Sequence, residues 1–162
     1  MNEQTFSQLV QEHQAMLFRV AYTLLHHQED CRDALQDALI KAWRNIHTLR
    51  NPDVFRSWMI RIVVNCAKDA LRKKKIQLVE LSGDLSAPED PVEDEDLASA
   101  LSQLDESLRL PIALYYMEGL SVREISKVLY LPQSTVKNRL FRGRKKLAET
   151  LNDYQKEAEA WN

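Results

Sequence analysis

Side chains able to contact nucleic acid gather in one stretch near the C-terminal end of this chain of 162 residues. Six basic residues and no acidic one fall between Lys137 and Lys146. Amide and cationic groups that project from one side of a helix suit phosphate contact and the reading of base edges in a major groove. The side chains of this kind are Gln133, Lys137, Asn138, Arg142, Lys145 and Lys146. A solvated basic helix on some other all-α protein is the alternative interpretation.

The sequence around this stretch predicts a helix-turn-helix. Ser121 and Glu124 have the spacing of a capping box, which marks the start of a first helix. Leu131-Pro132 ends that helix, because the residue before a proline is pushed out of the helical region. Apolar residues at helical spacing give each helix a core-facing side: Val122, Ile125, Val128 and Leu129 in the first, and Val136, Leu140, Leu147 and Leu151 in the second.

Catalysis is the first alternative to nucleic-acid binding, and no motif in the sequence supports it. The sequence has no glycine-rich phosphate loop, nucleophile elbow or His-Glu-x-x-His motif, and its three glycines stand alone. Eight acidic residues fall between Glu80 and Asp96, but acids in a proline-containing run are more often solvated than shaped into an acid–base site. We therefore expect a protein that is not an enzyme, with no cofactor and no small-molecule ligand.

Histidine and cysteine residues form no typical metal pattern. His26, His27 and Cys31 are close in sequence, but no second ligand pair at zinc spacing follows them. Cys31 and Cys66 are too few and too far apart to indicate a disulfide framework. We expect structural or incidental roles for these residues and no metal site.

Three helical patterns precede the acidic run. They cover about residues 5–26, about residues 29–49, and a stretch that follows Asn51-Pro52-Asp53 and ends near Lys75. Their apolar residues recur every three or four positions, and Trp43 is expected on the inward face of the second pattern. These helices predict one small N-terminal domain.

The third pattern is also a candidate for gripping single-stranded nucleic acid. Phe55 and Trp58 lie near several cations, which is the combination that stacks on bases and attracts phosphates. Their spacing of three, continued by Ile62, favours the core for both aromatic rings. The polar side of the helix is therefore the better candidate for contact, and it comprises Arg56, Arg61, Asn65, Lys68, Asp69 and Arg72.

Charge and composition divide the chain into two parts. The formal net charge is only -2, but Arg72 to Lys75 is a run of four cations, while residues 76–95 turn to glycine, proline, serine and acid. We predict an all-α protein with small helical domains at residues 1–75 and 96–162, joined by a flexible acidic linker at 76–95. Pro111 should kink the second domain or mark a helix start. The sequence has neither a signal pattern nor a membrane span, which predicts a cytoplasmic protein.

Three stretches, in order and at matching spacing, resemble the bacterial extracytoplasmic-function (ECF) sigma factors of the sigma-70 family. They are DCRDALQDALIKAWRNI, FRSWMIRIVVNCAKDALRKKK and LRLPIALYYMEGLSVREISKVLYLPQSTVKNRLFRGRKKL. The resemblance covers about residues 10–75 and 97–151. It implies an RNA polymerase sigma factor that directs core polymerase to specific promoters and assists promoter melting and transcription initiation.

The resemblance implies a role for particular residues in each domain. Contact with the clamp helices of the polymerase β′ subunit is implied for Asp33, Gln36, Asp37, Lys41 and Arg44. Contact with the minus-ten element is implied for Asn51, Asp53 and Phe55 in a loop that captures a flipped base, and for Asn65, Lys68, Asp69 and Arg72 beside it. Contact with the minus-thirty-five element is implied for Gln133, Ser134, Thr135, Lys137, Asn138 and Arg142.

The chain departs from the family pattern at one of these residues and at two residues of the turn before Gln133. Asp37 replaces a glutamate, which keeps the charge and shortens the reach. Tyr130 stands where the family usually has the glycine of the turn, and Pro132 where it often has a capping serine.

The resemblance also implies partners. They are core RNA polymerase, through its β′ clamp helices and β flap, promoter DNA, and an anti-sigma factor, which in this family is often membrane-bound. Two other interpretations stay open from the residues alone. One is an autonomous helix-turn-helix regulator that binds operators without polymerase, and the other is a sigma mimic that acts by partner exchange.

Overall fold

The computed structural model describes residues 1–81 and 95–160, with side chains for residues 1–79 and 97–153. Over the described ranges the chain is helical and contains no strand, which confirms the all-α class. The chain divides into two compact units, residues 1–90 and 91–162. Most of the expected linker lies outside the described residues. None of the helices in the described ranges is long and apolar enough to cross a membrane.

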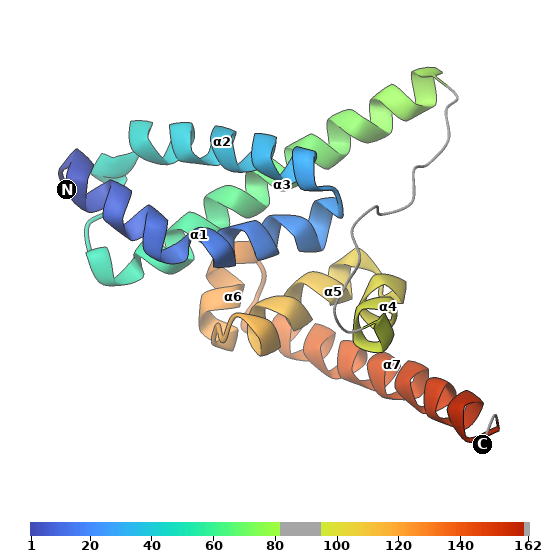
Figure 1. Cartoon of the computed structure of the whole chain (residues 1–162). Coiled ribbons are helices and arrows are strands. Elements are labelled where there is room, and N and C mark those ends of the chain that lie inside the picture. The colour runs from blue at the N-terminus through green and yellow to red at the C-terminus, as the bar shows by residue number, and fades with distance from the viewer. Residues whose placement is uncertain (82–94, 161–162) are drawn as a thin grey trace. The chain divides into compact units, whose positions relative to one another are not determined.

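The N-terminal unit is a bundle of three helices, each of which packs against the other two (Figure 1). A side chain fixes the start of the first helix, because Asn2 Oδ1 accepts a hydrogen bond from the Thr5 backbone N–H at 2.8 Å. The same helix ends at His26, whose backbone is left-handed at φ 53°. The helices are α1 (Glu3–Leu25), α2 (Gln28–Arg44) and α3 (Phe55–Leu81), with short 3-10 turns η1 (Ile46–Thr48) and η2 (Pro52–Val54) between the last two.

Helix α2 differs from the expected helix in its end and in its inward face. It ends at Arg44 rather than near residue 49, because Asn45 Nδ2 bonds back to the Lys41 carbonyl at 2.8 Å and the chain then tightens into η1. Its buried residues are all small: Cys31, Ala34, Ala38 and Ala42. Trp43 was expected to be inward but is 42% exposed, with its ring against Phe6 at a centroid distance of 5.2 Å. Small residues bring α2 close to its neighbours and leave no room for an indole between the helices.

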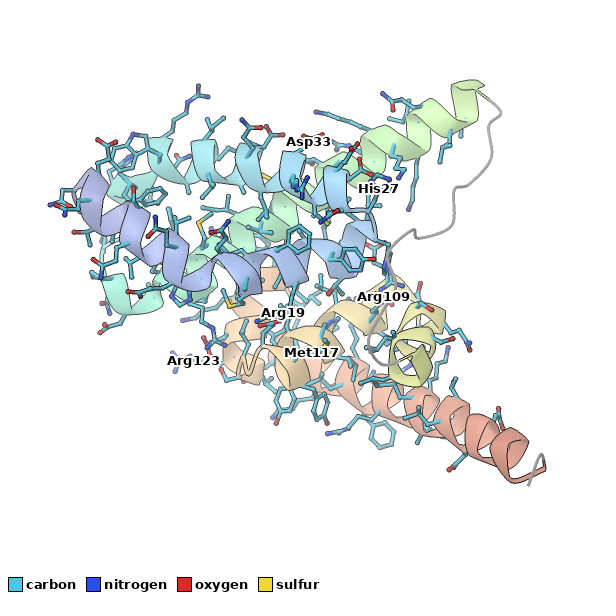
Figure 2. All side chains as sticks on the ribbon, viewed as in Figure 1. Arg19, His27, Asp33, Arg109, Met117 and Arg123 are labelled. Atoms are coloured by element: carbon cyan, nitrogen blue, oxygen red, sulfur yellow. The ribbon has the colours of Figure 1, made fainter. Side chains whose placement is uncertain are left out.

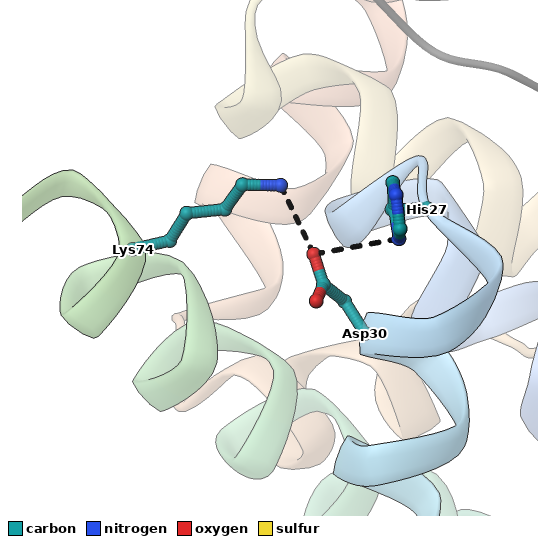
Figure 3. Close-up of polar contacts among 3 residues, drawn as sticks. All are labelled: His27, Asp30 and Lys74. Atoms are coloured by element: carbon teal, nitrogen blue, oxygen red, sulfur yellow. Dashed lines mark hydrogen bonds and ion pairs between the residues drawn. The ribbon is translucent and has the colours of Figure 1, made fainter. Parts of the chain in front are cut away.

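Helix α3 continues six residues beyond the expected end at Lys75. The added turns contain good helix formers and no proline or glycine, so nothing in them stops the helix. Figure 3 shows an ion pair that joins α3, just before its expected end, to the start of α2: Lys74 Nζ lies 3.0 Å from Asp30 Oδ2, and His27 Nδ1 lies 3.8 Å from the same oxygen. The expected linker at 76–95 is therefore helical over its first residues.

In the C-terminal unit, three helices gather around the N-terminal half of a long fourth helix (Figure 1). The Arg109 guanidinium donates to the Ser102 and Leu104 carbonyls at 3.4 and 3.3 Å, so it closes the end of the first of them. Burial of Arg109 lowers the pKa of its guanidinium. The elements are α4 (Glu95–Gln103), α5 (Glu106–Ile112), the π-helical turn η3 (Ala113–Met117), α6 (Val122–Leu129) and α7 (Gln133–Ala160).

Pro111 is buried inside α5, so it does not start a helix. Because proline has no N–H, one bond of the α5 ladder is absent there. The backbone widens immediately afterwards into η3, where the Glu118 N–H donates to the Ala113 carbonyl at 3.1 Å. Three large side chains of this turn are exposed: Tyr115, Tyr116 and Met117.

Candidate nucleic-acid and partner interfaces

The exposed face of α2 holds five residues of the expected polymerase site. Asp33, Gln36, Asp37, Lys41 and Arg44 are all exposed. At about 100° of rotation per residue they share one side of the helix. Figure 2 shows Asp33 on the side of α2 that faces away from α1.

An isoleucine lies within this charged face. Ile40 is 44% exposed and falls one turn from both Gln36 and Arg44. Ile40 was not among the predicted site residues, although an apolar residue on the polar side of an amphipathic helix was the available signal. The α2 face, defined here as the five residues above with Ile40, thus combines charge with apolar surface.

One carboxylate joins the α2 face to α3. Asp69 lies 4.0 Å from Lys41 Nζ through one oxygen and 3.3 Å from Arg72 Nη2 through the other. The family resemblance implies one partner for Lys41, the polymerase, and another for Asp69 and Arg72, the minus-ten element. The structure brings all three together into a single ion-pair network. Because these side chains are about half exposed or more, the network contributes at most about 1 kcal/mol to stability.

Cys66 lies beneath this network. Burial raises the pKa of its thiol; the positive charge of Lys41 opposes the rise, and the carboxylates of Asp37 and Asp69 add to it. The thiol is therefore a packing group at the α2–α3 contact rather than a reactive one.

The loop before α3 exposes two of its three expected contact residues. Asn51 and Asp53 are exposed, and Asn51 Oδ1 accepts a hydrogen bond from the Asp53 backbone N–H at 3.0 Å, which fixes the turn. Phe55, which the resemblance implies as a DNA contact, is only 1% exposed in the structure. Its ring lies among those of Phe6, His13 and Trp58, so Phe55 anchors the loop in the core.

The polar face of α3 is arranged as expected. Asn65, Lys68 and Arg72 are exposed along one side of the helix, and Asp69 is partly exposed beside them. Arg61 is exposed one turn before Asn65, so it extends this face towards the loop.

The start of α7 presents the third expected site. Gln133, Ser134, Lys137, Asn138 and Arg142 are exposed, whereas Thr135 is half-buried. The opposite side of α7 packs Val136, Leu140 and Gly143 into the core. The helix therefore directs its amide and cationic groups to solvent.

The turn before α7 has an unusual sequence, and side-chain and backbone hydrogen bonds define the helices on either side of it. The capping box forms as expected: the Glu124 N–H donates to Ser121 Oγ at 3.1 Å, and the Ser121 N–H to Glu124 Oε1 at 3.2 Å. Tyr130 adopts the left-handed conformation that favours glycine, with φ 56°. Pro132 provides the first helical acceptor, because its carbonyl receives the Val136 N–H at 3.1 Å.

An aromatic residue that was not predicted as part of the site lies at the centre of the exposed side of α7. Phe141 is 61% exposed, one turn after Asn138 and one turn before Lys145. The available signal was a large apolar side chain out of phase with the core-facing positions.

Comparisons with known proteins match both units. The family model for Sigma-70 region 2 matches residues 9–76, and that for Sigma-70, region 4 matches residues 94–147. The RNA polymerase sigma factor SigV of Bacillus subtilis is 33% identical over 140 residues, which cover 84% of each chain. The ECF RNA polymerase sigma factor SigW of the same organism is 30% identical over 171 aligned positions, covering 94% of this chain and 91% of its own. The chain belongs to the ECF sigma factors of the sigma-70 family.

Solved structures agree with this sigma factor's fold. The sigma factor RpoE of Bartonella quintana, solved in complex with the anti-sigma factor NepR, matches with a TM-score of 0.80 at 23% identity, over 91% of this chain and 97% of its own. CnrH, solved in complex with the cytosolic domain of CnrY, matches with a TM-score of 0.68 at 30% identity, over 94% and 90%. Proteins of this family are transcription initiation factors.

Proposed function

We propose that this sigma factor binds core RNA polymerase through the α2 face and promoter DNA through the loop before α3, the polar face of α3 and the start of α7. Core polymerase supplies the chemistry of RNA synthesis, and this chain supplies promoter specificity without a catalytic group. The β′ clamp helices are the partner for α2, and the β flap is a second polymerase contact. The protein acts in the cytoplasm, where polymerase and promoters are.

The composition of the α2 face is the observation that carries this proposal. Interfaces between proteins combine an apolar centre with a polar rim, and Ile40 among charged neighbours fits that description. DNA is a poor alternative partner here, because its phosphates would repel Asp33 and Asp37. Charges around an apolar contact set the orientation of the partner more than they add affinity.

At the minus-ten element, the exposed loop residues suit recognition of an unstacked base. Such a base offers all its edges to hydrogen bonding. The Oδ1 atom of Asn51 already holds the turn, which leaves its Nδ2 group as a donor. Asn65, Lys68 and Arg72 lie on the helix that follows the loop and suit the phosphate backbone of the opened strand.

At the minus-thirty-five element, α7 enters the major groove. Asn138 and Arg142 are four residues apart on the exposed side, and bidentate contacts of this kind are worth about 1 to 3 kcal/mol of base discrimination each. Phe141 is exposed one turn after Asn138 and rotated about 60° from it around the helix, where it can meet a thymine methyl group.

A polymerase pull-down tests the α2 assignment. The double charge reversal Asp33→Lys with Asp37→Lys should abolish capture of core polymerase without changing thermal unfolding, because both residues are exposed. Glu3→Lys with Glu12→Lys on α1 makes the same charge change away from the α2 face and should leave capture intact. Full capture by the α2 variant would overturn the assignment and favour an autonomous helix-turn-helix regulator.

We also propose an anti-sigma partner that covers the α2 face. One similar solved structure is a sigma factor bound to an anti-sigma factor, and another, CnrH, is bound to the cytosolic domain of CnrY, which supports this step. An inhibitor that co-purifies with the protein should be displaced by excess core polymerase in a competition pull-down. A stable complex that holds inhibitor, sigma factor and polymerase together would contradict occlusion.

A further inference from the structure

A tyrosine and an arginine that belong to none of the sites above form a pair at the edge of α7. Arg144 Nη1 donates a hydrogen bond to Tyr116 Oη at 2.9 Å. Arg144 comes from α7 and Tyr116 from the π-helical turn η3. Both side chains are exposed, and Tyr116 is 51% exposed.

The π-helical turn holds the tyrosine in place. The preceding residues Ala113 and Leu114 are buried and anchor the turn in the core. The Tyr115 ring packs edge-on against the Tyr116 ring, with centroids 4.9 Å apart at 74°. The Leu120 N–H bonds to the Leu114 carbonyl at 2.9 Å and closes the turn from the other end. The Tyr116 hydroxyl is therefore fixed relative to α7 although it faces solvent.

The pair has unused hydrogen-bond donors and an unpaired positive charge. In the part of the chain that the structure describes, no carboxylate lies within ion-pair distance of Arg144. A guanidinium has five N–H donors, and the contact with Tyr116 uses one of them. Because the tyrosine oxygen accepts from Arg144, its own proton remains available to donate. Two adjacent donors beside a positive charge match the oxygens of a phosphate.

The position of the pair suits the DNA backbone rather than the bases. Arg144 lies two helical turns after Lys137 on the same edge of α7, about 10 Å along the axis. It is rotated about 100° from the line through Asn138 and Lys145, which runs along the exposed side of the helix. When a helix lies in a major groove, its side edges face the phosphates on either flank.

We propose that Tyr116 and Arg144 form a phosphate clamp for the DNA backbone beside the minus-thirty-five element. This inference rests on the proposed function, because it requires α7 to enter the major groove. The clamp positions the helix and reads no base, so it sets affinity and register while Asn138 and Arg142 set sequence preference. Tyr116 acts as a positioning residue that holds the guanidinium and adds one donor of its own.

The salt dependence of binding by reconstituted holoenzyme tests the clamp. The probe is a duplex selected from a random library by the wild-type holoenzyme. Arg144→Gln should lower affinity and make the slope of log affinity against log salt shallower by about 0.9, the value for one lost phosphate contact. Tyr116→Phe should lower affinity roughly two- to tenfold without changing the slope, because it removes a hydroxyl and no charge. Neither variant should change the selected sequence.

Duplexes with one neutral methylphosphonate locate the contact. Wild-type protein should bind one of these duplexes less tightly than it binds the unmodified duplex. Arg144→Gln should bind that same modified duplex as tightly as the unmodified one. Lys146→Gln is the matched control, because Lys146 is exposed about 200° around the helix and should not couple to that phosphate. Arg144→Lys keeps the charge and should keep the wild-type slope.

Two outcomes separate failure of the clamp from failure of the proposed function. A wild-type slope for Arg144→Gln, while Arg142→Ala loses use of the upstream element, would overturn the clamp alone. No effect of either variant would remove α7 from the groove, and the clamp with it.

Discussion

Gly143 lies in the basic helix α7 and allows α7 to approach α5 closely. A Cβ atom at this position would lie 2.7 Å from Ile112 Cγ1 and 3.0 Å from its Cδ1. Alanine would gain about 1 kcal/mol of helix propensity, whereas overpacking a core costs about 1 to 3 kcal/mol. Gly143→Ala should therefore lower the free energy of unfolding in a denaturant titration. In an Ile112→Ala background the same substitution should be neutral or stabilising, and an equal loss in both backgrounds would contradict the close contact.

The buried thiol of Cys66 gives a pH dependence with a definite sign. Its pKa is raised by burial in the folded protein, so the unfolded chain loses this proton at lower pH than the folded one does. The contribution of Cys66 to stability is present at neutral pH and is lost as pH rises past the ordinary thiol pKa of about 8.5. The wild-type protein should lose more unfolding free energy between pH 8 and 10 than Cys66→Ala does. Parallel pH curves for the two proteins would show that the thiol is not desolvated.

Phe55 shows why single residues were harder to place than motifs. Helical spacing favoured the core, while the family resemblance implied a DNA contact, and contacts with Phe6 and His13 of α1 decided for the core. Those partners lie more than forty positions away in sequence, so no local pattern contains them. The capping box at Ser121 and Glu124 was predictable because both partners lie within one turn.

Among the elements, the ends of α2 and α3 were not predictable from local signals. The end of α2 depends on the side chain of Asn45, and the extension of α3 on the absence of proline and glycine at residues 76–81. The faces of α2, α3 and α7 were largely predictable, because a period of 3.6 residues separates apolar from polar positions. The ion-pair network between α2 and α3 was not, since it depends on how the two helices pack.

That network supplies a test of the α2–α3 contact. Asp69→Asn removes the carboxylate shared by Lys41 and Arg72 and should lower the free energy of unfolding by about 0.2 to 1 kcal/mol at low salt. The loss should vanish near 1 M salt, where the screening length is about 3 Å. Asp53→Asn, an exposed acid outside the network, is the control and should have little effect at either salt concentration. A loss that persists at high salt would point to a packing role for Asp69 instead.

At the scale of the whole molecule, two compact units hold separate interaction surfaces on one chain of net charge -2. The acidic run lies between the two basic helices in sequence and can compete with phosphates for their cations. The isolated protein should therefore bind promoter duplex weakly, and core polymerase should raise that affinity greatly. Gel-shift titrations with and without polymerase check this, and nanomolar specific binding by the protein alone at physiological salt would count against it.

Run-off transcription with purified core polymerase tests the central claim most directly. Wild-type protein should start synthesis at one defined position on templates that carry a selected promoter, and core polymerase alone should not. The double reversal at Asp33 and Asp37 should abolish the product. Arg142→Ala should reduce the product most on templates that depend on the upstream element. Absence of any defined transcript with wild-type protein, under conditions where it binds core polymerase, would contradict the account.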